Sequence, residues 1–570
     1  MDDPGGGGLG AAGDTLGALP ALVLLLPVLA GLGATALAAF GFLPAIGHLD
    51  ISLDAWRALL AWPGLAASLA LTLRVGLGAT LLSLLTALGI VASLHGSSLH
   101  GSSLRSARRL RAVQAAIVPL LAVPHVALAI GLGFLIAPSG WIARLLSPWL
   151  TGWHTPPDLA IVHDRWGLAL IAGLWLKETP YLVLMLLAAL AQSGASASLR
   201  GAAALGYAPW RAWTLLVLPR LWPQVWVPLL AVLAFSLSVV DVALVLGPAT
   251  PPTLAVQVVR WLDDPDVTLW LPAAAASVLL MALVAAVAGM LLALARGLAW
   301  VARGRLRHGH RGGEGMAADA AATGAGLLLA VAGGASLLLL ALWAGARSWR
   351  FPDPWPSGWS VGPQWAGLAD PALSTLALAA VTTVLALLLA VAWLRRGGGH
   401  AAILYAPLLV PQVGFLFGFQ MVLVRLRLDG GWLALAWSHL LFVLPYVALT
   451  LAGPFRALDP RLGRSAAMLR AGPWRVLLRI SLPMLARALL AAAAVGFAVS
   501  VSLYLPTLFA GAGRVATLAT EAVALSSGGD RRVLAATALA QAGLPLLAYA
   551  GAVLLPAWRA RRRRGLAIAG

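Results

Sequence analysis

The chain has 570 residues, of which 61% are hydrophobic and only 10% are charged, and its mean hydropathy is +0.90. The polar residues are too few to cover the surface of a soluble fold of this length. The composition therefore excludes an ordinary soluble protein and indicates a polytopic membrane protein. The net charge of +19 comes from arginines dispersed at the ends of apolar runs rather than from a basic domain, which argues against nucleic-acid binding.

Apolar runs of about 20 residues or more recur along the whole chain, and runs of this length select helices over a β-barrel. The first run lacks a basic segment before it, so we expect a retained span rather than a signal peptide. The fold class is therefore all-α, with about twelve transmembrane helices. The runs lie at about 15–42, 64–94, 112–137, 168–192, 222–247 and 268–301, then at 322–345, 371–394, 401–426, 432–453, 483–510 and 533–557.

A charged, glycine-rich segment at 302–321 separates two groups of six runs and is interpreted as a linker. The first half is then 1–301 and the second half is 322–570. With six spans in each half, both termini fall on one side of the membrane. The loops on that side carry most of the basic residues, so the positive-inside rule predicts that both termini are cytoplasmic.

Two basic, amphipathic loops indicate a tandem duplication. LRGAAALGYAPWRAWTLLVLPRLWP begins at Leu199, and LGRSAAMLRAGPWRVLLRISLPML begins at Leu462. Each loop contains a Pro-Trp pair and a second proline ten residues after the first. The Pro-Trp pairs begin at Pro209 and Pro473, which are 264 residues apart. Because each copy holds the same basic loop on the same side, the two repeats are expected to be parallel.

The loops, at 195–222 and 456–486, are predicted to form short helices, because proline can start a helix but cannot continue one through its interior. In the first loop, Gly206 can supply a left-handed turn between two such helices. One interpretation is an interfacial helix that rests in the lipid headgroups. Two equivalent loops instead favour docking of two copies of a cytoplasmic subunit.

The loops resemble the EAA motif, in which Glu-Ala-Ala, a glycine and a downstream Leu-Pro mark the permeases of bacterial binding-protein-dependent ABC importers. Arg200 and Arg464 stand where the motif has glutamate, and Arg470 replaces the second glycine, which suggests a divergent ATPase surface. The matching residues are Ala202, Leu205, Gly206, Pro209, Trp210, Leu218 and Pro219 in the first loop, and Ala466, Leu469, Pro473, Trp474, Leu482 and Pro483 in the second.

The chain as a whole is similar to fused double permeases of the ferric-iron and thiamine importer group, and Leu505 to Arg532 looks most like its YnjC-like branch. The resemblance implies a bacterial inner-membrane protein whose loops carry coupling helices seated in a dimer of cytoplasmic ATPases. A solute-binding protein would dock on the outer face. The resemblance also implies no enzymatic activity and no cofactor in this chain, and the sequence has no GxxxxGK[ST] loop for nucleotide phosphates.

Four charged residues fall at bilayer depth, where charges are rare and mark candidate pathways. They are Arg74, Lys177, Glu178 and Asp241. The alternative is a structural role in ion pairs, for example with Arg74. His125 has no second histidine at metal-ligand spacing, so no metal site is expected.

The sequence therefore predicts the permease component of an ABC importer. The alternative is an ion-coupled secondary transporter with an internal repeat, but that class needs buried carboxylates in both halves, and the second half shows none clearly within a span. A membrane protein with an assembly role would not need paired docking loops. The sequence leaves the substrate open among thiamine, ferric iron, a polyamine and an anion.

Overall fold

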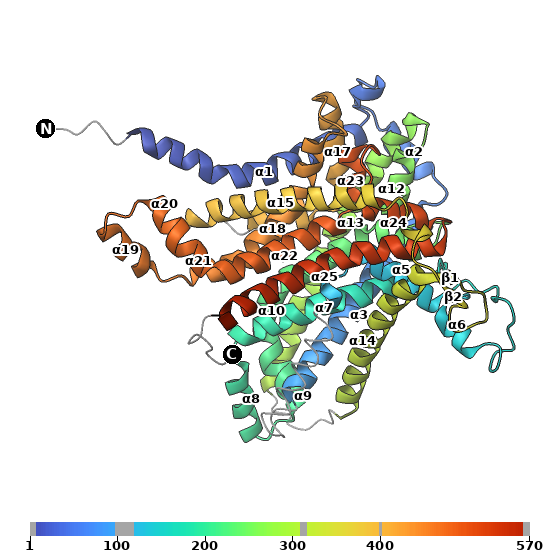
Figure 1. The fold of residues 1–570 in the computed structure, drawn as a ribbon, viewed down its shortest axis with the longest axis horizontal. Coiled ribbons are helices and arrows are strands. Elements are labelled where there is room, and N and C mark those ends of the chain that lie inside the picture. Colours follow the sequence, from blue (N-terminus) through green and yellow to red (C-terminus); the bar gives the residue numbers. More distant parts are fainter. Residues whose placement is uncertain (1–6, 97–118, 308–315, 398–401, 563–570) are drawn as a thin grey trace.

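The computed structural model describes residues 7–96, 119–307, 316–397 and 402–562, which are almost entirely helical (Figure 1). The helices of the first half are α1 (Gly7–Ala39), α2 (Asp54–Ala61), α3 (Leu65–Gly96), α5 (His125–Ile136), α6 (Trp141–Leu146), α7 (Leu168–Gln192), α8 (Ala195–Ala204), α9 (Pro209–Ala212), α10 (Leu218–Ser238), α11 (Asp241–Leu246), α12 (Leu254–Leu262) and α13 (Trp270–Arg307). A π turn, Trp213–Val217, joins α9 to α10.

The elements of the second half are α14 (Met316–Gly345), β1 (Ala346–Ser348), β2 (Gly358–Trp359), α15 (Ala369–Arg395), α16 (Ala402–Leu409), α17 (Gln412–Arg425), α18 (Trp432–Arg456), α19 (Pro460–Met468), α20 (Pro473–Val476), α21 (Leu482–Met484), α22 (Ala486–Ser502), α23 (Leu505–Gly511), α24 (Leu518–Ser526) and α25 (Arg531–Arg562). A second π turn, Leu477–Ser481, joins α20 to α21. Strands β1 and β2 pair antiparallel.

Ten helices in the described part of the chain are long and apolar enough to cross a membrane. The number is twelve if two bent pairs each count as one span: 403–409 with 412–425, bent by 101°, and 473–484 with 486–502, bent by 78°. The all-α, polytopic fold is therefore confirmed.

The structure differs from several of the predicted bounds. The runs at 222–247 and 483–510 are each interrupted, because α10 ends at Ser238 and α22 at Ser502, and the short helices α11 and α23 follow. The run at 112–137 begins outside the described residues and breaks at Pro124, before α5. Both ends of the 302–321 segment are helical, since α13 continues to Arg307 and α14 begins at Met316, while 308–315 lie outside the described residues.

The duplicated sequence forms duplicated structure. The π turns, α11 and α23, and α12 and α24 each begin 264 residues apart. The N–H of Leu254 donates to Thr72 Oγ1 at 2.9 Å, and the N–H of Leu518 donates to Thr375 Oγ1 at the same distance. In both repeats a threonine of the second long helix, α3 or α15, thus holds the first residue of a short helix, α12 or α24.

The first long helix of each half packs against the other half. Helix α1 lies along α17, and α14 lies along α5 and α3. Glycines permit the close approach, because a Cβ at Gly418 would collide with the carbonyl oxygen of Gly31, and a Cβ at Gly131 would lie 2.5 Å from that of Ser336. These crossings hold the two halves together through backbone contact.

The two loops lie at one end of the molecule, toward the left and lower left of Figure 1, where α1 begins and α25 ends. We call this the loop end. The opposite end carries β1, β2 and α6, and we call it the hairpin end.

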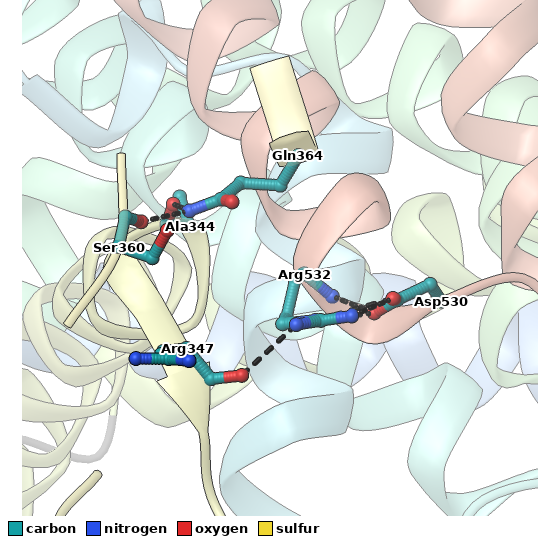
Figure 2. A network of polar contacts seen from close by, with 6 residues as sticks. All are labelled: Ala344, Arg347, Ser360, Gln364, Asp530 and Arg532. Carbon is teal, nitrogen blue, oxygen red and sulfur yellow. Dashed lines mark hydrogen bonds and ion pairs between the residues drawn. The ribbon is translucent and has the colours of Figure 1, made fainter. Parts of the chain in front are cut away.

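At the hairpin end, polar contacts tie the β1–β2 segment to neighbouring helices (Figure 2). Gln364 donates from Nε2 to the carbonyls of Ala344, at 2.8 Å, and Ser360. Arg532, at the start of α25, pairs with Asp530 and donates to the carbonyl of Arg347 at 2.9 Å. The segment is thereby fixed on both α14 and α25.

Candidate functional site

The first loop has a turn between two helices. Helix α8 ends, Gly206 takes the left-handed conformation with a φ of 78°, and α9 begins at Pro209. The N–H of Tyr207 donates to the carbonyl of Ala202 at 3.0 Å, which closes the turn. Arg220 of α10 donates to Ser198 of α8 at 2.5 Å and joins the two helices.

The second loop repeats this geometry. Arg470 takes the left-handed conformation with a φ of 57°, and the N–H of Ala471 donates to the carbonyl of Ala466 at 3.0 Å. The guanidinium of Arg395 lies 5.2 Å from the centre of the Trp474 ring. Beside it, a hollow of about 320 Å³ opens between α18, α19 and α20.

The π turns precede the Leu-Pro pair in both loops. Proline has no N–H, and its ring would clash with the carbonyl four residues earlier in a regular helix. Those carbonyls belong to Leu215 for Pro219 and to Arg479 for Pro483, and both residues lie inside a π turn. The wider turn gives room for the proline ring, so each helix continues through it.

The loops expose apolar side chains at the loop end. Leu469 is 84% exposed, Trp474 is 68% exposed and Leu205 is 61% exposed. Trp210 is half-buried, and Ala202 and Ala466 are buried. The other motif residues divide as follows: Arg200, Pro219, Arg464, Arg470, Pro473 and Pro483 are exposed, and Leu218 and Leu482 are half-buried.

A cavity of about 420 Å³ lies between the two halves. Lys177, Glu178 and Asp241 of the first half line it. Arg74 does not, because its guanidinium is exposed and lies 4.8 Å from the centre of the Trp166 ring. The structure thus brings three of the four charged candidates together.

Lys177 is the chain's only lysine and it does not pair with Glu178. Its ammonium donates to the carbonyls of Leu120, at 3.1 Å, Leu121, at 3.0 Å, and Val123. Pro124 has no N–H to offer the carbonyl of Leu120, so the lysine supplies the donors that the interrupted helix lacks.

The two carboxylates of the cavity have different partners. Glu178 Oε1 lies 3.2 Å from Nε2 of His125, whose ring packs 4.7 Å from that of Phe235. Asp241 begins α11, and its Oδ1 accepts a hydrogen bond from the N–H of Val242 at 2.9 Å.

Sequence reasoning overlooked His125 as a partner of Glu178, and it overlooked the tyrosines of the cavity. Four of the chain's six tyrosines line the cavity: Tyr181, Tyr446, Tyr504 and Tyr549. The first two follow the intramembrane prolines of α7 and α18 at matching places in the two repeats. The repeated Pro-Tyr pair was the signal in the sequence that pointed to this position.

Among the described residues, no three His, Cys, Asp or Glu side chains gather closely enough to hold a metal ion. The residues that line the cavity offer ionic and aromatic contacts to a ligand.

No family model matches the chain. It is 34% identical over 521 residues to the inner membrane ABC transporter permease protein YnjC of Escherichia coli strain K12, a match that covers 90% of this chain and 93% of that protein. Identity at this level over nearly the full length, together with the polytopic helical fold, shows the family. The chain belongs to the multi-pass inner-membrane ABC transporter permeases.

Proposed function

We propose that the chain is the membrane permease of a binding-protein-dependent ABC importer and supplies both of its transmembrane halves. In this proposal both halves form the translocation pathway, and the loops at 195–222 and 456–486 dock on two cytoplasmic ATPase subunits. The loops are EAA-type loops, and the chain belongs to the thiamine and ferric-iron group of importers. ATP is hydrolysed on the separate ATPase, so the permease itself carries no catalytic residue and needs no cofactor.

The observation that carries the proposal is the repeated geometry of the two loops. Each has a helix, a left-handed turn, a Pro-Trp helix and a π turn, and both loops lie at the same end of the molecule. A dimer of ATPases presents two equivalent surfaces, so a single-chain permease needs two equivalent docking elements. The exposed Leu205 and Leu469 supply apolar contacts for them.

The charge of the loops predicts the surface of the partner. Arg200, Arg464 and Arg470 are exposed where the EAA pattern has glutamate or glycine. Charges across an interface complement one another, so the matching ATPase groove is acidic at these places.

Docking of the ATPase sets the orientation of the whole chain. We propose that the loop end and both termini face the cytoplasm, which agrees with the arginine-rich loops at 195–222 and 456–486. The hairpin end then faces outward and receives a solute-binding protein.

An ion-coupled secondary transporter is the alternative, and the cavity argues against it. Both carboxylates come from the first half, while Val443 and Leu505 occupy the matching places in the second. Family membership also favours ATP-driven transport.

The test is co-purification from native membranes, followed by uptake measurements. We expect the chain to purify with an ATPase subunit, and we expect Leu205→Asp with Leu469→Asp to lose that subunit and uptake at an unchanged membrane level. Val361→Asp is the matched control, because Val361 is also 84% exposed but lies near β2 at the hairpin end. Purification without an ATPase, or uptake that persists without ATP, would overturn the proposal.

A further inference from the structure

We propose that the central cavity takes a small organic cation, whose positive charge lies between Glu178 and Asp241 and whose apolar or aromatic part lies against the tyrosines. This inference rests on the proposed function, because it names the substrate class of that pathway. The volume of about 420 Å³ is in the range of small-molecule sites, which is about 300–1,000 Å³.

The charge of the cavity wall favours a cationic ligand. Among the residues that the structure describes, no arginine lines the cavity, although the chain has 39 basic residues. Its one ammonium, Lys177, has three N–H groups, and all three are directed to the carbonyls of Leu120, Leu121 and Val123. The lysine therefore has no donor left for an anionic ligand.

Two carboxylates, Glu178 and Asp241, lie in the wall of the cavity. Glu178 shares one oxygen with the His125 ring, and Asp241 forms no ion pair with any residue that the structure describes. Two carboxylates against one engaged ammonium leave the wall negative when His125 is neutral. A cation satisfies this wall, whereas an anion is repelled by it.

Aromatic side chains line the cavity beside the carboxylates. Tyr181, Tyr446, Tyr504 and Tyr549 present rings whose faces attract cations, most strongly where water is excluded. Aromatic rings also pack against the apolar part of an organic molecule. Without a group of three metal-ligating side chains in the described residues, the wall suits an organic cation better than a bare metal ion.

The two halves of the chain contribute different kinds of residue to the cavity. The ionisable carboxylates and His125 belong to the first half, and the second half contributes neutral residues such as Gln412, Phe442 and Thr450. A ligand held between the halves therefore meets charge on one side and neutral, partly apolar surface on the other. This arrangement selects a molecule with a cationic part and an uncharged part.

The experiment measures binding to the full-length permease in lipid nanodiscs by equilibrium dialysis. The probes are benzyltrimethylammonium as the aromatic cation, benzyl alcohol as its neutral counterpart and benzenesulfonate as the anion. We expect benzyltrimethylammonium to bind most tightly. We expect Glu178→Gln and Asp241→Asn each to weaken its binding about tenfold, because each removes one charge from a partly desolvated site.

Asp370→Asn is the control, since Asp370 is an exposed carboxylate at the start of α15, outside the cavity. It should leave the binding of benzyltrimethylammonium unchanged. The inference is overturned if the sulfonate binds as well as the ammonium, if no probe binds, or if both charge-removing variants bind the cation normally. Co-purification of the ATPase is measured separately. If the permease retains its ATPase but fails this binding test, only the proposed substrate class is overturned, and the proposed function stands.

Discussion

Gly206 and Arg470 occupy the same place in the two repeats, and both have a positive φ, 78° and 57°. A glycine adopts this conformation freely, whereas a side chain with a Cβ is strained by about 1–2 kcal/mol. The second loop nevertheless keeps the turn of the first. The geometry of the turn is thus retained where the residue that favours it has been replaced.

Replacement of Arg470 by glycine should therefore relieve strain and raise the stability of the permease, by about 1 kcal/mol. Arg464→Gly is the matched control, since Arg464 lies inside α19 and glycine in a helix costs about 1 kcal/mol. The melting temperature of each variant in detergent measures the effect, and the two substitutions should shift it in opposite directions. An equal fall in the melting temperature of both variants would show that the positive φ at Arg470 carries no strain.

Gly418→Ala should destabilise the contact between α1 and α17, by several kcal/mol, because the new Cβ would collide with the carbonyl oxygen of Gly31. Gly334→Ala in α14 is the control, since a Cβ there meets no atom within 4 Å. Thermal unfolding of the purified variants checks the prediction. A melting temperature for Gly418→Ala equal to that of the control would mean that α1 and α17 can move apart without a loss of folding free energy.

The sequence predicted the features that depend on local pattern. Span positions follow from the length of apolar runs, and the paired loops follow from the repeated Pro-Trp spacing at Pro209 and Pro473. The breaks after Ser238 and Ser502 escaped prediction, because the residues on either side are equally apolar and hydropathy does not register a change of direction.

Contacts between distant segments could not be read from local pattern either. The crossing of α1 onto α17 joins Gly31 to Gly418, and nothing near either glycine in sequence specifies the other. The same holds for Glu178, for which the sequence offered Arg74 as an ion-pair partner, whereas the structure joins it to His125. Only the packed helices determine which polar groups meet.

Lys177→Met should destabilise the permease by about 3 kcal/mol, because it leaves the carbonyls of Leu120, Leu121 and Val123 without donors in a buried place. Lys177→Arg should not restore stability, since a planar guanidinium cannot converge on three carbonyls as a compact ammonium does. The fraction of each variant that elutes as folded monodisperse protein, and its melting temperature, measure the loss. Wild-type stability in the methionine variant would show that the carbonyls find other partners.

Asp530→Asn should lower stability only where the carboxylate is charged. Hydrogen bonds from Arg532 hold the pKa of Asp530 below its ordinary value, so this group stabilises the fold above about pH 4 and loses its contribution as pH falls further. The difference in melting temperature between wild type and Asp530→Asn should be constant above about pH 5 and should shrink toward pH 3. In an Arg532→Gln background the same substitution should have a smaller effect, because the partner that binds the carboxylate is already gone. A difference that stays the same across this pH range, or in both backgrounds, would place the contribution of Asp530 in contacts other than the one with Arg532.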